Sequence, residues 1–405
     1  MITKNISLSI DDFNYYLPPE RIAQSPLEKR DESKLLLYNS ENNAIEHKQF
    51  YELPEIINSN YVLIRNNTKV FPARFFLKKQ TGGNVELLIE TPLDNKVPEK
   101  ALNSPPPQNW QCLMRGRNLI PGLALSGKFS DLISIKANIL GIYDSKRVVQ
   151  LEWEPTHLTL SELLEEIGRI PLPEYIKRQP KSDDKIKYQT VFAQKKGSIA
   201  APTAGLHFTD MVNEKLLKNG VDVLDITLHV GSGTFLPLKT SIVDDHKMHS
   251  EQFQIDIQLL KNLRDIIISK RKIIATGTTT VRTLESLYWL GLSDKIDFDS
   301  IKINQWIWRE RVPTNIALSS IDRLIEMMQK ENITLLIGET QLMIVPGYEF
   351  KIINGMITNF HLPKSTLLLL VAAFIGREKM LEIYQNALDN NYRFLSYGDA
   401  TLLLK

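Results

Sequence analysis

Residues 197–230 read GSIAAPTAGLHFTDMVNEKLLKNGVDVLDITLHV and combine three successive patterns. GSIAAP is typical of a strand, TDMVNEKLLKNG of a helix that ends at a glycine, and VDVLDITLHV of a second, mostly apolar strand. A strand, a helix and a strand in this order form the repeating unit of a parallel sheet. The stretch therefore predicts an α/β fold.

The same alternation continues towards the end of the chain. Runs with helical or strand patterns lie at 257–270, 272–277, 281–291, 334–338, 355–360 and 365–376. Such alternation predicts a largely parallel sheet, either open or closed as a barrel. In both forms ligand-binding residues gather where the strands end, at their carboxyl ends.

Residues 61–154 have a different pattern of short β-rich runs. Turn signals separate these runs, for example TGG at 81–83 and PG at 121–122. Runs of this length and spacing predict a small antiparallel sheet or barrel. We therefore expect a barrel-like α/β domain formed by 1–60 and 155–405, with an antiparallel β-barrel-like domain of residues 61–154 inserted in it.

Composition limits the classes of protein to consider. The chain has 405 residues, which suggests about two domains, a formal net charge of +2 and a single cysteine, Cys112. One cysteine excludes an internal disulfide and a multi-cysteine zinc site and fits a reducing cytosol, so we expect Cys112 to serve packing. Residues 1–13 lack the apolar core of a signal peptide, and the apolar run Leu367–Ile375 is too short to cross a bilayer. These features predict a cytoplasmic protein with no membrane association.

Three segments place a histidine beside small residues or at the end of an apolar run. They are AAPTAGLHF (200–208) with His207, TLHVGSGTF (227–235) with His229, and TNFHLPKST (358–366) with His361. Histidine exchanges protons near neutral pH, and small residues let a ligand approach the backbone. Because all three segments fall where strands are expected to end, we expect them to share one site, although each histidine alone also fits a structural role.

Other segments allow more than one interpretation. Gly277–Thr280 follows a strand and opens a helix, so its amides suit an anionic group such as a carboxylate or phosphate, although a plain capping sequence looks the same. His246, His249 and Glu251 have a spacing that occurs in zinc sites. Arg30 is suited to bind an anionic ligand group with Asp31 orienting it, or the two form a solvated charge pair.

Nine segments, in order along nearly the whole chain, resemble one known family. They read IAQSPLEKRDESKLL (22–36), PLPEYIKR (171–178), YQTVFA (188–193), AAPTAGLHF (200–208), LHVGSGTF (228–235), MHSE (248–251), GTTTVRTLES (277–286), TNFHLPKSTLLLLVAAFIG (358–376) and YRFLSYGDA (392–400). They closely resemble the S-adenosylmethionine:tRNA ribosyltransferase-isomerases of the queuosine pathway. Departures are modest: Asn354 stands where an acidic residue is expected, and 341–345 vary a usually more aromatic strand.

The resemblance implies a cytoplasmic enzyme that modifies tRNA. Family members transfer and isomerise the ribosyl part of S-adenosylmethionine onto 7-aminomethyl-7-deazaguanine at the wobble position, giving epoxyqueuosine, adenine and methionine. The family is similar in architecture to an α/β barrel-like domain with an inserted β-barrel. No metal or other cofactor is implied, S-adenosylmethionine being a co-substrate, and no obligate protein partner is evident.

The resemblance and the chemistry together give candidate site residues. The proton transfers are assigned to the three histidines, with two carboxylates as orienting groups or alternative bases: His207, His229, His361, Glu251 and Asp399. The candidates for binding S-adenosylmethionine are Gly231, Gly233, Thr234, Thr278, Thr279 and Arg282. The candidates for binding the substrate and the tRNA anticodon region are Arg30, Asp31, Tyr175, Lys177 and Arg178.

Two other classes of function stay open from the sequence. One is a metal-dependent hydrolase built on His246, His249 and Glu251, which would lose its activity to a chelator. The other is a protein that binds tRNA without catalysis, which would bind RNA tightly without turnover.

Overall fold

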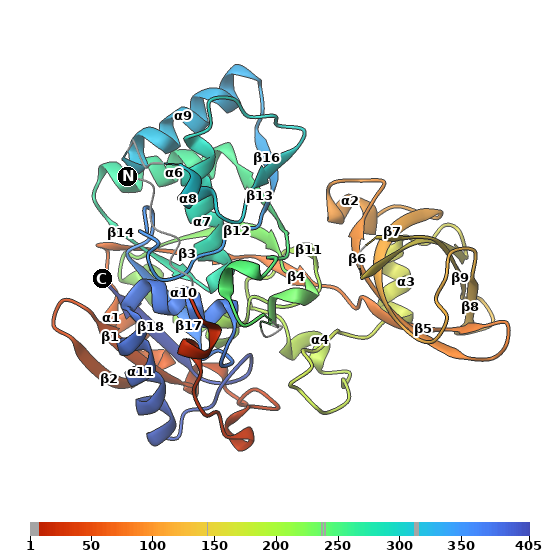
Figure 1. The fold of residues 1–405 in the computed structure, drawn as a ribbon, viewed down its shortest axis with the longest axis horizontal. Coiled ribbons are helices and arrows are strands. Elements are labelled where there is room, and N and C mark those ends of the chain that lie inside the picture. Colours follow the sequence, from red (N-terminus) through yellow and green to blue (C-terminus); the bar gives the residue numbers. More distant parts are fainter. Residues whose placement is uncertain (1–7, 144, 236–237, 239, 312–315) are drawn as a thin grey trace. The chain divides into compact units, whose positions relative to one another are not determined.

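The computed structural model describes residues 8–143, 145–235, 238, 240–311 and 316–405 (Figure 1). It divides the chain into two compact units. The larger unit comprises the described residues up to Asn67, residues 190–192 and the described residues from Pro202 onward, and the smaller one comprises Thr68–Gln189 and Ala193–Ala201. These boundaries differ from the expected ones, because residues 61–67 belong to the larger unit and residues 155–189 and 193–201 to the smaller.

The larger unit is built on a ten-stranded mixed sheet. In spatial order its strands are β15 (Ile301–Ile303), β16 (Leu335–Thr340), β13 (Glu251–Asp256), β12 (Asp222–His229), β3 (Tyr61–Asn66), β14 (Lys272–Thr276), β17 (Gly355–Asn359), β18 (Ala400–Leu404), β1 (Lys34–Asn39) and β2 (Ala44–Gln49). The four neighbours β12, β3, β14 and β17 are parallel to one another. Strand β3 pairs on both sides, so the run Tyr61–Asn66 is a central strand of this sheet and not part of the β-rich domain.

The helices of the larger unit are α1 (Leu53–Ile56), α5 (Asp210–Lys218), α6 (Ile257–Ile268), α7 (Thr278–Gly291), α8 (Ile307–Glu310), α9 (Ala317–Lys330), α10 (Thr366–Ile375) and α11 (Arg377–Asp389). Helices α5, α6, α7 and α10 follow the expected runs, whereas the other helices had no expected counterpart. Every residue of α7 is buried, and α7 contacts β14, β3, β12 and α9. A Cβ at Gly291 would lie 2.1 Å from the Ser320 carbonyl oxygen, so only glycine lets α7 and α9 approach this closely.

A buried apolar cluster on one face of the sheet fixes α1 and α5 against it. Leu53 and Ile57 at α1, and Val212 and Leu216 of α5, pack there with strand residues such as Ile274. Phe208 belongs to the same cluster and immediately follows the 3₁₀ helix η5 (Thr203–His207). The cluster therefore anchors the AAPTAGLHF segment beside the strand ends.

The smaller unit contains a closed antiparallel barrel, which confirms the expected β-barrel. Its strands, in order around the barrel, are β10 (Lys146–Glu154), β7 (Gln108–Arg115), β6 (Asn84–Pro92), β5 (Arg74–Lys79), β8 (Ala124–Lys128) and β9 (Ser134–Tyr143). Its helices are α2 (Pro98–Leu102), α3 (Leu160–Ile167) and α4 (Asp184–Lys187). A Thr159–Glu162 capping box starts α3.

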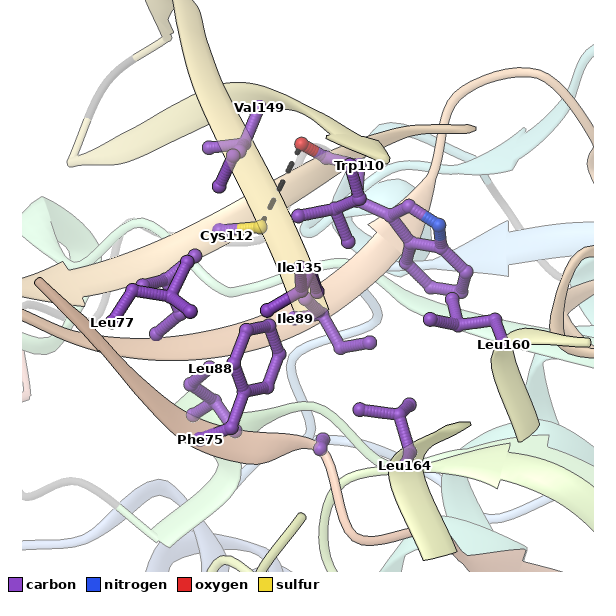
Figure 2. Close-up of a cluster of buried hydrophobic side chains, with 14 of the residues drawn as sticks. Phe75, Leu77, Leu88, Ile89, Trp110, Cys112, Ile135, Val149, Leu160 and Leu164 are labelled. Carbon is purple, nitrogen blue, oxygen red and sulfur yellow. Dashed lines mark hydrogen bonds between the residues drawn. The ribbon is translucent and has the colours of Figure 1, made fainter. Parts of the chain in front are cut away.

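The barrel core is apolar and includes the single cysteine (Figure 2). Cys112 is fully buried among Trp110, Phe75, Ile89 and other residues, and burial raises the pKa of its thiol. A high thiol pKa leaves little of the reactive thiolate. The expectation that Cys112 serves packing is therefore confirmed.

Of the expected strand GSIAAP (197–202), only Gly197 and Ser198 lie in a strand, and its partner is one that the sequence did not indicate. β11 (Lys195–Ser198) pairs in parallel with β4 (Thr68–Val70) in a separate two-stranded sheet of the smaller unit. The expected strand–helix–strand unit therefore does not share one sheet. Among the helices of the described residues, none has the length and apolar character needed to cross a membrane.

Candidate active site

The strand register brings the three histidine segments to one edge of the large sheet. The parallel strands β12, β3, β14 and β17 end at this edge with His229, Asn66, Thr276 and Asn359. Strand β13 is antiparallel to β12, so Glu251 at its start lies at the same edge. Strand β18 is antiparallel to β17, so Asp399, which precedes it, also lies there. Thus all five candidates for proton transfer lie at or follow this edge, His207 through its contact with Asn359.

His207 is held by hydrogen bonds at both ring nitrogens. Its Nδ1 lies 2.7 Å from Ser33 Oγ, and its Nε2 lies 3.0 Å from Asn359 Nδ2. The Asn359 oxygen accepts a hydrogen bond from Thr203 at 2.9 Å, which orients the amide so that it donates to His207 Nε2. Nδ1 therefore carries the proton and donates to Ser33. A histidine with both nitrogens occupied positions η5 against β1 and β17 but offers no nitrogen to a substrate in this arrangement.

Burial keeps His207 neutral. Its exposed fraction is 4%, and burial, together with the positive charges of Arg393 and Arg30, lowers its pKa to about 3. Arg30 in η3 (Arg30–Glu32) is thus close enough to influence this edge electrostatically. Since its own pKa is lowered by burial, Arg30 is a half-buried cation and not a solvated one.

His361 is also buried and neutral, but its hydrogen bonds differ. Its Nε2 lies 2.9 Å from Thr358 Oγ1, and burial lowers its pKa to about 3. The backbone of His361 is fixed by two tyrosines, because its N–H donates to Tyr384 Oη at 3.1 Å and its carbonyl accepts from Tyr15. Within the described residues no hydrogen bond to its Nδ1 occurs. His361 therefore has a fixed backbone and one ring nitrogen available to a ligand.

The two lowered pKa values predict how stability depends on pH. Between about pH 6.5 and 3 an unfolded chain protonates these histidines while the folded protein does not, so the unfolded state binds more protons. Stability is therefore complete above about pH 6.5 and falls as the pH drops, by up to about 1.4 kcal/mol per pH unit for each histidine. We expect urea unfolding to show this fall, and His361→Gln to reduce its slope. An unchanged slope in that variant would contradict the assignment.

His229 ends β12 and is nearly buried. Its Nε2 lies 3.2 Å from Gln254 Nε2, which projects from the neighbouring strand β13. The glycine-rich loop follows directly, with Gly231 and the 3₁₀ helix η6 (Ser232–Phe235). A Cβ at Gly233 would lie 2.4 Å from the His249 ring, whereas one at Gly231 would meet nothing within 4 Å. Gly233 therefore serves close packing with His249, and the side chain of Thr234 lies outside the part that the structure describes.

Glu251 and Arg282 form a buried ion pair. Arg282 Nη1 donates to Glu251 Oε2 at 2.7 Å, and the side chains are 3% and 2% exposed. The guanidinium also donates to the carbonyls of Leu342 and Thr340. The pair thus joins α7 to β13 and to the end of β16. Arg282 is committed to these partners, which argues against the expected roles of Arg282 in binding S-adenosylmethionine and of Glu251 as a base.

Asp399 organises a loop and does not orient any of the three histidines. Its carboxylate accepts from the backbone N–H of Arg393 at 2.7 Å and of Lys34 at 3.1 Å, and Arg393 Nη2 lies 3.3 Å away. These bonds close the 393–399 loop and tie it to the start of β1. The expected role of Asp399 next to the histidines is therefore replaced by a structural one.

Asp31 likewise has a structural partner. It is 5% exposed and accepts a hydrogen bond at 2.8 Å from Thr209, the N-cap residue of α5. The carboxylate thus holds η3 against the start of α5, where the helix dipole also favours a negative charge. The expected role of Asp31 in orienting Arg30 stays a prediction.

The candidate tRNA contacts of the smaller unit divide into two kinds. Arg178 makes two hydrogen bonds of 2.7 and 2.6 Å to the fully buried Asp184. These bonds fix the segment between residues 178 and 184. Lys177 is exposed and Tyr175 half-buried. A cavity of about 260 Å³ with Arg74, Arg115, Lys177 and Arg178 in its lining lies here. The side chains of Lys177 and Tyr175 are thus at least partly exposed, and that of Arg178 pairs with Asp184.

The geometry argues against the metal-dependent alternative. Within the described residues no three or more histidine, cysteine or carboxylate side chains cluster as a metal site requires. Glu251, which that alternative needs as a ligand, is paired with Arg282. His246 and His249 therefore lack the third ligand that a catalytic zinc site requires.

Sequence reasoning missed the polar side chains that support the histidines. Two of them, Ser33 and Asn359, bond the ring of His207, and Thr203 in turn bonds Asn359. At the same edge Asn66 donates a hydrogen bond to the carbonyl of Leu228. A signal was present, because asparagines stand at the end of the strand-like run 61–67 and one residue before the end of the run 355–360. Asparagine is depleted in strands, so its place at two strand ends was informative.

Comparisons with known proteins show which proteins the whole chain is similar to. The sequence matches the family model described as "Queuosine biosynthesis protein" over residues 10–403. It is 38% identical to the S-adenosylmethionine:tRNA ribosyltransferase-isomerase of Fusobacterium nucleatum, covering 99% of this chain and 98% of that one. It is 40% identical to the protein of that name from Vesicomyosocius okutanii, covering 98% and 99%. A crystal structure of S-adenosylmethionine tRNA ribosyltransferase from Thermotoga maritima is 29% identical, covers 97% of this chain and 100% of that one, and has a TM-score of 0.47.

Proposed function

The chain belongs to the queuosine biosynthesis family of S-adenosylmethionine:tRNA ribosyltransferase-isomerases, and we propose that it performs this reaction on 7-aminomethyl-7-deazaguanine at the wobble position of tRNA. The observation that carries the proposal is identity of 38–40% to enzymes of this name over at least 98% of both chains. The three histidine segments at one sheet edge support it. The product would be epoxyqueuosine, with adenine and methionine released.

The chemistry requires several proton movements at one place. The sulfonium of S-adenosylmethionine acidifies the neighbouring 5′ carbon of the ribose, so a base can remove a proton there. An acid assists the departure of adenine, and the attacking amine of the deazaguanine must lose protons. Neutral imidazoles accept such protons, and His361 has a ring nitrogen available for this task.

Burial also favours the form of His361 that this task needs. It lowers the pKa of the imidazole, so His361 is neutral before substrate binds and has the form that can accept a proton. Burial excludes competing water from this step.

The finer features of the substrate also belong to the proposal. We propose that the anticodon region is the part of the tRNA that binds, that exposed Lys177 contacts a phosphate, and that Tyr175 stacks on an unpaired base. No metal or further cofactor is needed for the proton transfers described above. A tRNA substrate also favours the cytoplasm as the location.

A direct assay tests the proposed function. Purified protein with S-adenosylmethionine and tRNA bearing 7-aminomethyl-7-deazaguanine is expected to release adenine and methionine in step with modified tRNA. A chelator is expected to leave the rate unchanged. Release of S-adenosylhomocysteine would indicate a methyltransferase instead, and equal activity with tRNA that lacks the modified base would contradict the proposal.

A further inference from the structure

The long helix α7 begins inside the protein without a cap. Its N-cap residue is Gly277, which has no side chain to accept hydrogen bonds and whose φ of 90° favours glycine. The N–H groups of Thr278, Thr279 and Thr280 have no hydrogen-bond acceptor among the described residues, whereas that of Val281 bonds the Gly277 carbonyl. All residues of this first turn are buried. Orphan amides at a buried helix start require a partner from elsewhere.

A second orphan group lies directly before this helix start. Thr276 ends β14, is 2% exposed, and its hydroxyl has no hydrogen-bond partner within the described residues. Leaving a hydroxyl buried and unpaired costs stability, so such groups in folded proteins ask for an explanation. The residue lies next to Gly277, so the orphan hydroxyl and the three orphan amides occur within five consecutive residues.

The neighbours of the helix start are the 3₁₀ helix η5 and the side chain of Thr279. Ile274 lies two residues before Thr276 on the same face of β14 and packs into the cluster with Phe208, so the Thr276 hydroxyl lies on the face where η5 runs. A Cβ at Gly277 would lie 3.8 Å from Ala204 of η5 and 3.7 Å from Thr279 Oγ1. Small residues and a second hydroxyl thus surround the helix start.

We propose that the start of α7, with the Thr276 hydroxyl, binds the carboxylate of the methionyl part of S-adenosylmethionine. Backbone amides and the positive end of the helix dipole favour an anion, and each orphan group is a hydrogen-bond donor. A phosphate of the tRNA has the same acceptor chemistry, but it lies within a chain and would bring two riboses with it. A terminal carboxylate reaches a buried helix start more easily. The inference rests on the proposed function, which supplies the ligand.

The Thr276→Val variant gives the first test, with decarboxylated S-adenosylmethionine as the comparison ligand. The wild-type protein is expected to bind S-adenosylmethionine at least ~10-fold more tightly than the decarboxylated compound, because charge-assisted hydrogen bonds are strong. In Thr276→Val this preference is expected to fall several-fold. Without ligand the variant is expected to be at least as stable as wild type, since it buries a methyl group in place of an unpaired hydroxyl. A clear loss of stability would show that the hydroxyl has a structural partner and would overturn its assignment.

The amides are tested with proline at the first helical position. Thr278→Pro removes one N–H, and proline is well tolerated at this position of a helix. Its matched reference is Thr278→Ala, which loses the side chain but keeps the N–H. We expect Thr278→Pro to bind S-adenosylmethionine ~10-fold more weakly than Thr278→Ala, and the two variants to bind the decarboxylated compound equally. Equal binding of S-adenosylmethionine by the two variants would overturn the role of the amides.

The outcomes separate the inference from the proposed function. A wild-type protein that binds both ligands equally, yet is active in the assay above, would overturn the inference alone. A protein that binds no S-adenosylmethionine would overturn the proposed function. If the variants instead weaken tRNA binding and its dependence on salt, the anion is an RNA phosphate and the carboxylate assignment is wrong.

Discussion

The His361→Gln variant is expected to turn over at least ~100-fold more slowly than the wild-type protein while remaining folded, the lower end for loss of a general acid or base. His361 has its Nε2 bonded to Thr358, a backbone held by Tyr15 and Tyr384, and a ring nitrogen available to substrate. Glutamine retains a polar side chain but has no ring nitrogen that can take up and release a proton during the reaction. Single-turnover rates of adenine release, with circular dichroism to check folding, measure the effect.

Variants of two other histidines serve as comparisons for this result. His47→Gln is the control, because His47 also bonds a hydroxyl, that of Tyr392 at 2.8 Å, but lies on edge strand β2. We expect it to keep near-normal turnover. His207→Gln is expected to reduce stability first, because both nitrogens of His207 already bond Ser33 and Asn359. A folded and fully active His361→Gln protein would exclude His361 as acid or base.

The largest loss of stability is expected for Arg282→Met. Removing one partner of a buried ion pair leaves an uncompensated charge, which typically costs about 3–5 kcal/mol. In this variant Glu251 would remain buried, and the carbonyls of Leu342 and Thr340 would lose a donor. The free energy of unfolding, measured in urea, is expected to fall by that amount.

A surface arginine and a double variant serve as controls for this measurement. Arg264 pairs with Asp265 on the surface, so Arg264→Met is expected to change stability by less than about 1 kcal/mol. Adding Glu251→Gln to Arg282→Met removes the buried, unpaired charge of Glu251 and should recover part of the lost free energy of unfolding. If Arg282→Met is as stable as wild type, the ion pair does not hold α7 against β13.

Elements whose signals are local could be predicted reliably from the sequence. The helix at Leu160–Ile167 carries its capping box within four residues, and the apolar run of α10 is buried almost throughout. The three histidine segments could be assigned to one edge, because parallel strands present their carboxyl ends together. The resemblance across nine segments indicated the family, because motifs of this length are specific.

Other features could not be predicted from the sequence, because the segments that pair are far apart along the chain. Tyr61–Asn66 is a buried apolar run that fits a barrel strand or a central sheet strand equally well, and only pairing with β12 and β14 decides between them.

For the site, the sequence by itself determined which residues lie at the strand ends, since strand and loop patterns are set by neighbouring residues. Tertiary structure alone decided what each of them does there. Glu251 and Arg282 stand 31 positions apart and His207 and Asn359 152 apart, yet each pair is in hydrogen-bond contact. These contacts turn an expected base and an expected ligand-binding arginine into a buried ion pair. Among the described residues, the start of α7 and His361 are two places that keep polar groups without a hydrogen-bond partner, because burial there removes water without supplying every partner.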